Sequence, residues 1–113
     1  MLFRRCALIC GLVSSALAVA AVTVNLAWNA SPDLDVVSYT MYQATNGADG
    51  TFKSIGVIYG RTNCFFSVTN LSSGNYWWCV TASNDFLESL PSNILPWTVK
   101  PTPPTIIKAG HHP

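Results

Sequence analysis

The sequence predicts an all-β protein folded as a single antiparallel β-sandwich. Beyond residue 21, short runs of β-branched and aromatic residues alternate between apolar and polar side chains. Clusters of turn-forming residues separate these runs at near-regular intervals, and no stretch has a helical period. The chain has 113 residues, half of them hydrophobic and 10% charged, which suits one domain with one core and excludes a disordered chain.

Residues 1–20 have the pattern of a secretory signal peptide. Arg4 and Arg5 form a short basic start, residues 6–20 are uncharged and apolar, and Ala18-Val19-Ala20 suits a signal peptidase. A membrane anchor is the alternative, because a spanning helix needs roughly 20 apolar residues. Residues from Val22 onward are needed for the first strand, which leaves about 15 for the membrane. We therefore expect a secreted, periplasmic or cell-surface domain, bound to a membrane only if this segment stays uncleaved.

The first strand is predicted at residues 22–28, where Val22, Val24, Leu26 and Trp28 share one face. Further strands are expected at residues 37–44, 52–58 (bulged near Gly56), 64–68, 76–83 and 93–99. Residues 84–88 read as a loop. Residues 100–113 read as an extended, proline-rich flexible tail outside the domain, which spans residues 21–99.

Three segments carry a family resemblance: residues 24–33, residues 37–42, and residues 71–84 continued by 88–93. Together they resemble a fibronectin type III domain of the bacterial or viral sort, over about residues 22–99. The resemblance implies an immunoglobulin-like sandwich and a tyrosine corner at Tyr76, whose hydroxyl would bond to the preceding loop. The predicted core comprises Trp28, Tyr39, Leu71, Tyr76, Trp78 and Val80.

The sequence departs from the family at its start. The family's first strand would precede Val22, where only the signal-like segment lies, so this strand is expected to be short or missing. The sheet edge would then be open, and open edges recruit partners. Alternatively, residues 16–21 are retained and form the strand. The loop at residues 84–88 also lacks the glycine that the family often has, which leaves its shape open.

Outward-facing aromatic residues are the candidate binding residues. Tyr42 and Trp77 are expected on neighbouring strands, pointing away from the core, and Tyr59 and Phe86 are expected in loops. Such side chains suit a protein or a glycan partner. The alternative is that Tyr42 and Trp77 form a cross-strand pair that only stabilises the sheet.

Two cysteines remain after the signal-like segment. Strand alternation turns Cys64 inward and Cys79 outward, on strands expected in opposite sheets. A disulfide needs Cα atoms within about 7 Å and converging Cβ atoms. We therefore favour one buried and one exposed free thiol over a bridge.

The sequence offers no catalytic constellation. Both histidines, His111 and His112, lie in the tail, so no histidine-activated nucleophile can be built in the domain. Asp33 and Asp35 have no evident third ligand and are expected in a solvated turn, and no metal or cofactor is predicted. Residues 21–113 carry four basic and five acidic side chains, which disfavours nucleic acid and anionic membrane as partners.

The sequence thus predicts a secreted, non-catalytic binding or adhesion module. The alternatives are a structural or assembly subunit of a virion or surface appendage, self-associating through the open edge, and an accessory module of a secreted hydrolase. Fold class alone does not decide among them.

Overall fold

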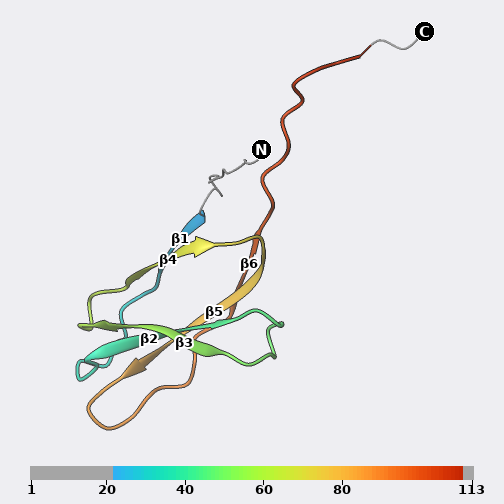
Figure 1. The fold of residues 1–113 in the computed structure, drawn as a ribbon. Coiled ribbons are helices and arrows are strands. Elements are labelled where there is room, and N and C mark those ends of the chain that lie inside the picture. The colour runs from blue at the N-terminus through green and yellow to red at the C-terminus, as the bar shows by residue number, and fades with distance from the viewer. Residues whose placement is uncertain (1–21, 111–113) are drawn as a thin grey trace, which may run out of the picture.

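The computed structural model describes residues 22–110, so the predicted signal peptide and both histidines lie outside the described residues. This part of the chain forms six strands and no helix (Figure 1). The strands are β1 (Val22–Ala27), β2 (Ser38–Ala44), β3 (Lys53–Tyr59), β4 (Phe65–Leu71), β5 (Gly74–Ser83) and β6 (Leu95–Val99). Over residues 22–110, therefore, there is no helix long and apolar enough to cross a membrane.

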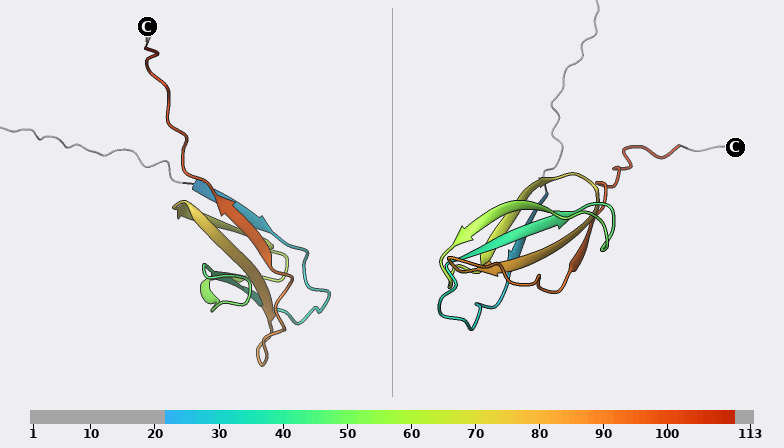
Figure 2. Two further views of the ribbon diagram at one scale, coloured as in Figure 1. Left: turned by 90° about the vertical axis from the view of Figure 1, so that its right-hand side faces the viewer. Right: turned by 90° about the horizontal axis from the view of Figure 1, so that it is seen from below.

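The strands form two antiparallel sheets, as predicted. One sheet pairs β1 with β4, and the other has the order β3-β2-β5-β6 (Figure 2). Pro96 lies in β6, an edge strand of the larger sheet, where a missing backbone N–H is tolerated. The tail over residues 100–110 has no secondary structure and is exposed throughout.

The core lies between the two sheets and draws on both. Its buried members are Val24, Leu26, Val68 and Leu71 from the smaller sheet, with Met41, Tyr76, Trp78 and Val99 from the larger. Trp78 is the most deeply placed, with 1% of its surface exposed. Its indole Nε1–H donates to Gln43 Oε1 at 2.8 Å, which satisfies the one polar group of an otherwise apolar side chain.

The predicted core residues occupy two depths. Tyr39, Leu71, Tyr76 and Trp78 are buried, whereas Val80 and Trp28 are half-buried and pack against the core. The Trp28 ring meets Tyr39 edge-on, with ring centroids 5.4 Å apart. Its buried Nε1–H has no hydrogen-bond acceptor among residues 22–110. Trp28 is therefore less deeply buried than predicted for a core residue.

Tyr76 has the geometry of a tyrosine corner. Its hydroxyl donates to the carbonyl oxygen of Ser72 at 2.7 Å, across the turn between β4 and β5. The ring stacks on Trp78 at a centroid distance of 5.9 Å and an interplanar angle of 8°. The turn between the two strands is therefore anchored directly to the core.

A bulge in β3 lies beside Gly56, where the sequence suggested one. Met41 pairs with Gly56 and Tyr42 with Ser54, so Ile55 has no partner on β2. Without the extra residue, Ile55 and Ile58 would face opposite sides of the sheet, because side chains alternate along a strand. With it, both isoleucines pack against the core.

Candidate functional site

Three loops leave the sandwich at the same end. Ser38 pairs with both Tyr59 and Ser83, so the start of β2 and the ends of β3 and β5 lie in one row (Figure 1). Ala27 pairs with Phe65, which puts the end of β1 and the start of β4 at that end as well. Residues 28–37, 60–64 and 84–94 therefore begin or end side by side.

Large apolar side chains are exposed on these loops and at the adjoining strand end. Their exposed fractions are Leu34 82%, Tyr59 73%, Phe86 89%, Leu87 74% and Leu90 88%. We call these five residues the apolar loop end. A domain of this size rarely leaves so many large apolar groups in water at one end without a use for them.

Only two members of the apolar loop end were predicted from the sequence. Phe86 lies in the loop where we expected it, but Tyr59 is the last residue of β3, paired with Ser38, and not a loop residue. The three leucines were missed. The signal that could have found them is an apolar residue inside a turn-rich segment, where strand alternation assigns it no place in the core.

Hydrogen bonds hold the tip of the apolar loop end in one shape. Asn84 Oδ1 accepts from the backbone N–H groups of Phe86 and Leu87, both at 2.8 Å. Asn84 Nδ2 donates to Asp35 Oδ2 at 3.0 Å, which joins this loop to residues 28–37. Phe86 and Leu87 are thus presented on a closed turn, which lowers the conformational entropy a partner would have to freeze.

The base of the same loops is also tied together. Tyr39 donates its hydroxyl hydrogen to the carbonyl oxygen of Arg61 at 2.6 Å and accepts from the backbone N–H of Ser31 at 2.9 Å. Arg61 Nη1 in turn donates to the Ser31 carbonyl oxygen at 2.9 Å. Burial raises the pKa of the Tyr39 hydroxyl, so it stays a neutral donor near neutral pH.

A second surface lies on the outer face of the larger sheet. A shallow pocket of about 490 Å³ has Tyr42, Phe52, Cys79, Glu88 and Ile94 among its lining residues. The Glu88 carboxylate accepts hydrogen bonds from the Thr81 and Tyr42 hydroxyls, which lower its pKa, that from Thr81 the most. The bond to Glu88 is the main cause of the raised pKa of Tyr42.

Tyr42 and Trp77 lie on the outer face of neighbouring strands, but they do not face each other. Tyr42 pairs with Cys79, whereas Trp77 pairs with Ala44 on β2 and with Pro96 on β6. Both aromatic residues are half-buried, and Ala44 is only 2% exposed. These contacts make Tyr42 and Trp77 part of the packing of the sheet, and neither is a free aromatic platform.

The expectation of an exposed Cys79 was wrong. Cys79 has the predicted outward parity, yet it is only 7% exposed, because residues 88–94 return alongside β5 and Ile94 lines the same pocket. Ser92 fastens this segment, since its backbone N–H donates to the Val80 carbonyl oxygen at 2.9 Å. Burial raises the pKa of the Cys79 thiol. Cys64 is half-buried beside the other sheet, and both thiols are free.

Within residues 22–110, no three His, Cys, Asp or Glu side chains come together as ligands for a metal ion. Asp33 and Asp35 do not act as a pair. The Asp35 carboxylate accepts a hydrogen bond from Asn84 Nδ2, whereas the backbone N–H of Asp33 donates to Ser31 Oγ. The described residues therefore offer apolar side chains for contact with a partner, on loops that hydrogen bonds hold in place.

Two solved structures are similar to this sandwich. The fibronectin type III domain derived from human KIAA0970 protein has a TM-score of 0.60 and 21% identity, covering 76% of this chain and 69% of its own. The fibronectin type-III domain of human fibronectin type III domain containing protein 3 has a TM-score of 0.54 and 25% identity, covering 71% of this chain and 74% of its own. The sandwich therefore has the fibronectin type III fold.

No protein-family model and no curated protein matches the chain. Both similar structures are human domains, so the bacterial or viral type stays a prediction. The strand that the fibronectin type III resemblance places before Val22 falls outside the described residues, and β1 pairs only with β4 among those described.

Proposed function

We propose that this fibronectin type III domain is an exported, non-catalytic binding module that holds a protein partner at its apolar loop end. The observation that carries the proposal is the set of five large apolar side chains, 73–89% exposed, on adjoining loops and a strand end. Loops on a rigid scaffold are where such domains have room for binding residues. Burying one such side chain is worth about 1.5–3 kcal/mol, so the five together could offset much of the entropy cost of association.

The charges around the apolar loop end narrow the class of partner. Asp33, Asp35 and Asp85 are exposed on these loops, whereas Arg61, the one cation in residues 28–37, 60–64 and 84–94, is engaged with the Ser31 carbonyl oxygen. An apolar centre with an acidic rim is complementary to a protein surface with an apolar centre and basic rim. This favours a protein partner over a glycan.

The proposal is tested by comparing two paired-serine variants as immobilised baits for surface proteins of the source cells. Phe86→Ser/Leu87→Ser removes two of the five side chains of the apolar loop end, and Ile106→Ser/Ile107→Ser removes a similarly exposed apolar pair from the tail. We expect a protein that is retained by the wild type and by the tail variant but is lost from the loop-end variant. Measured with that protein purified, affinity should fall at least tenfold, about 1.4 kcal/mol.

Retention of the same proteins by all three baits would overturn the assignment of binding to the loop end. Export is tested separately by the N-terminal sequence of the protein recovered outside the cell. A start at Ala21 supports cleavage behind Ala20, and a start at Met1 contradicts it.

A further inference from the structure

Strand β1 has one edge without a partner among residues 22–110. The Trp28 backbone N–H donates to the Cys64 carbonyl oxygen at 3.2 Å, which extends the ladder between β1 and β4. In an antiparallel ladder, alternate residues turn their backbone groups to the partner. Leu26 therefore faces β4 with its backbone, whereas the N–H and C=O groups of Asn25 and Ala27 face away. This row of free groups is a template for another strand.

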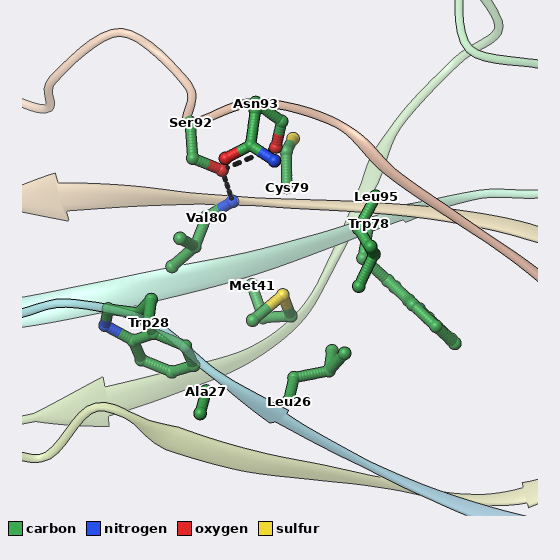
Figure 3. Close-up of a pocket in the computed structure, with 10 residues that line it drawn as sticks. All are labelled: Leu26, Ala27, Trp28, Met41, Trp78, Cys79, Val80, Ser92, Asn93 and Leu95. Carbon is green, nitrogen blue, oxygen red and sulfur yellow. Dashed lines mark hydrogen bonds between the residues drawn. The ribbon is translucent and has the colours of Figure 1, made fainter.

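An apolar groove follows this free edge. A pocket of about 200 Å³ opens beside β1, with Leu26 and Trp28 on one side, Leu95 on the other and Met41 behind them (Figure 3). A second pocket of about 320 Å³ shares Trp28, Val80, Ser92 and Asn93 with the first and extends it toward the loops. Because they share these residues, the two pockets adjoin each other between β1 and residues 89–95.

Trp28 lines both pockets, and its buried indole N–H has no hydrogen-bond partner among residues 22–110. A buried donor without an acceptor is unfavourable, so this side chain is incompletely satisfied in a single copy.

The chain carries a segment suited to fill the groove, and its own sandwich leaves that segment uncovered. After β6, residues 100–110 run away from the sandwich in every view (Figures 1 and 2). Ile106 and Ile107 are 88% and 92% exposed. Residues 105–108, Thr-Ile-Ile-Lys, contain no proline and three β-branched residues in a row, the composition of a strand.

We propose that residues 105–108 of one copy add as a strand to the β1 edge of a second copy. Because side chains alternate along a strand, one of Ile106 and Ile107 would enter the groove beside Trp28 and the other would cover its rim. Pro101, Pro103 and Pro104 stiffen the link to β6 and hold the segment away from its own groove, which favours a second copy as the acceptor.

Each copy then gives one segment and receives one. Such a contact is heterologous, so it builds open chains unless the rotation between copies closes a ring. Of the apolar loop end, only Leu90 lines the groove, so every copy would keep Leu34, Tyr59, Phe86 and Leu87 for a protein partner. The inference therefore goes beyond the proposed function and stands or falls separately from it.

Sedimentation velocity of the full chain over a concentration series tests the proposal. The wild type should show masses above one chain that rise with concentration. Ile106→Ser/Ile107→Ser should sediment as a monomer, whereas Lys100→Ser/Thr102→Ser, a matched pair in the same tail, should assemble like the wild type. Phe86→Ser/Leu87→Ser should also assemble, which separates this result from a failure of loop-end binding.

A mixing experiment tests the acceptor edge. Ala27→Pro removes an N–H that faces the free edge and leaves the ladder to β4 intact. Ala27→Pro alone should not assemble, nor should Ile106→Ser/Ile107→Ser, but an equal mixture should give a dimer in which one chain supplies the segment and the other supplies the groove. Circular dichroism of each variant checks that its sheets are formed.

Three outcomes would overturn the proposal. A wild type that is monomeric at every concentration would mean that the edge is unused or is filled by the chain's own residues before Val22. Assembly that survives Ile106→Ser/Ile107→Ser would mean that the β1 edges pair with each other or that another surface associates. A mixture that stays monomeric while both variants are folded would exclude the tail as the donor.

Discussion

At the scale of single residues, hydrogen bonding and burial decide what each side chain can do. Glu88 is exposed by area, yet its carboxylate is engaged by two hydroxyls. Cys79 has the parity of a surface residue, yet it is covered. Tyr42 is aromatic and outward-facing, yet its hydroxyl is tied to Glu88. In each case a neighbour from a distant part of the chain changes the role that residue type alone suggests.

Glu88→Gln should weaken the fold modestly and only above the acid range. The hydrogen bonds from Thr81 and Tyr42 lower the folded-state pKa of Glu88. A lowered carboxyl pKa adds stability above the unfolded-state pKa, and this stability is lost as pH falls through the folded-state pKa. We expect a loss of at most about 1 kcal/mol at neutral pH, because the site is exposed.

Urea unfolding at neutral and at acid pH measures this effect. The gap between the wild type and Glu88→Gln should close as Glu88 becomes protonated. Asp49→Asn, in the turn between β2 and β3, is the matched control for removing one carboxylate. A gap that stays constant down to acid pH would contradict the role assigned to the carboxylate.

Cys79 should react slowly with thiol reagents in the native protein. Burial raises its pKa, so little thiolate is present, and the covering segment blocks access. Mass spectrometry after brief alkylation should find Cys64 modified first and both cysteines modified after unfolding. Equal native rates for the two cysteines would show that residues 88–94 do not cover Cys79 in solution.

At the scale of elements, a close contact between Gly56 on β3 and the Phe66 ring on β4 determines how the two sheets pack around β3. Gly56 lies opposite Met41 beside the bulge, and a Cβ atom there would come within 2.5 Å of Phe66 Cε1 on β4. Glycine is required here for space, because Phe66 packs against the core from the other sheet. The bulge and the glycine together let β3 bring Ile55 and Ile58 to the core.

Gly56→Ala should therefore destabilise the protein by about 1–3 kcal/mol, the usual cost of overpacking a core. Chemical unfolding gives the free energy directly. Combining Gly56→Ala with Phe66→Leu provides the control, because a smaller ring-free side chain makes room for the methyl group. If Gly56→Ala lowers the free energy of unfolding as much in the Phe66→Leu background as in the wild type, the contact with the Phe66 ring is not the cause of the loss.

At the scale of the whole molecule, different residues serve stability and the proposed binding: the core residues stabilise the fold, and the apolar loop end is proposed to bind. The core is shared by both sheets, whereas the loop-end side chains make up much of the exposed apolar surface at one end. The tail leaves from β6 and places a further apolar pair outside the sandwich. The apolar loop end and the apolar pair of the tail can therefore each be removed by substitution without changing the core.

Phe86→Ser/Leu87→Ser should change the free energy of unfolding by no more than about 0.5 kcal/mol, because the replaced groups are already in water. Trp78→Ala should cost about 3–5 kcal/mol, since it empties the centre of the core. Thermal and urea unfolding of the two variants measure the contrast. A large decrease in the free energy of unfolding of Phe86→Ser/Leu87→Ser would mean that these two side chains stabilise the fold.

Much of the fold could be predicted from the sequence, and less of the binding surface. The strand at residues 76–83 shows its alternation clearly, and it became the centre of the larger sheet over Gly74–Ser83. Strand limits shifted by one to three residues, as for Tyr59, because pairing with a neighbour, not local pattern, ends a strand. Leu34, Leu87 and Leu90 were not predicted as binding residues, because an apolar residue in a turn-rich segment does not show by itself which loops meet at one end.

The sequence by itself determined the all-β class and the division of most strand residues between core and surface. It could do so because side chains alternate with a period of two, so the pattern of apolar residues encodes the two faces of each strand. Only the tertiary structure decided that Cys79 is covered, that Tyr42 donates a hydrogen bond to Glu88 and that the loops carrying the apolar loop end meet at one end of the sandwich. These properties arise from contacts between residues far apart in the chain, and no local pattern records which distant segments will meet.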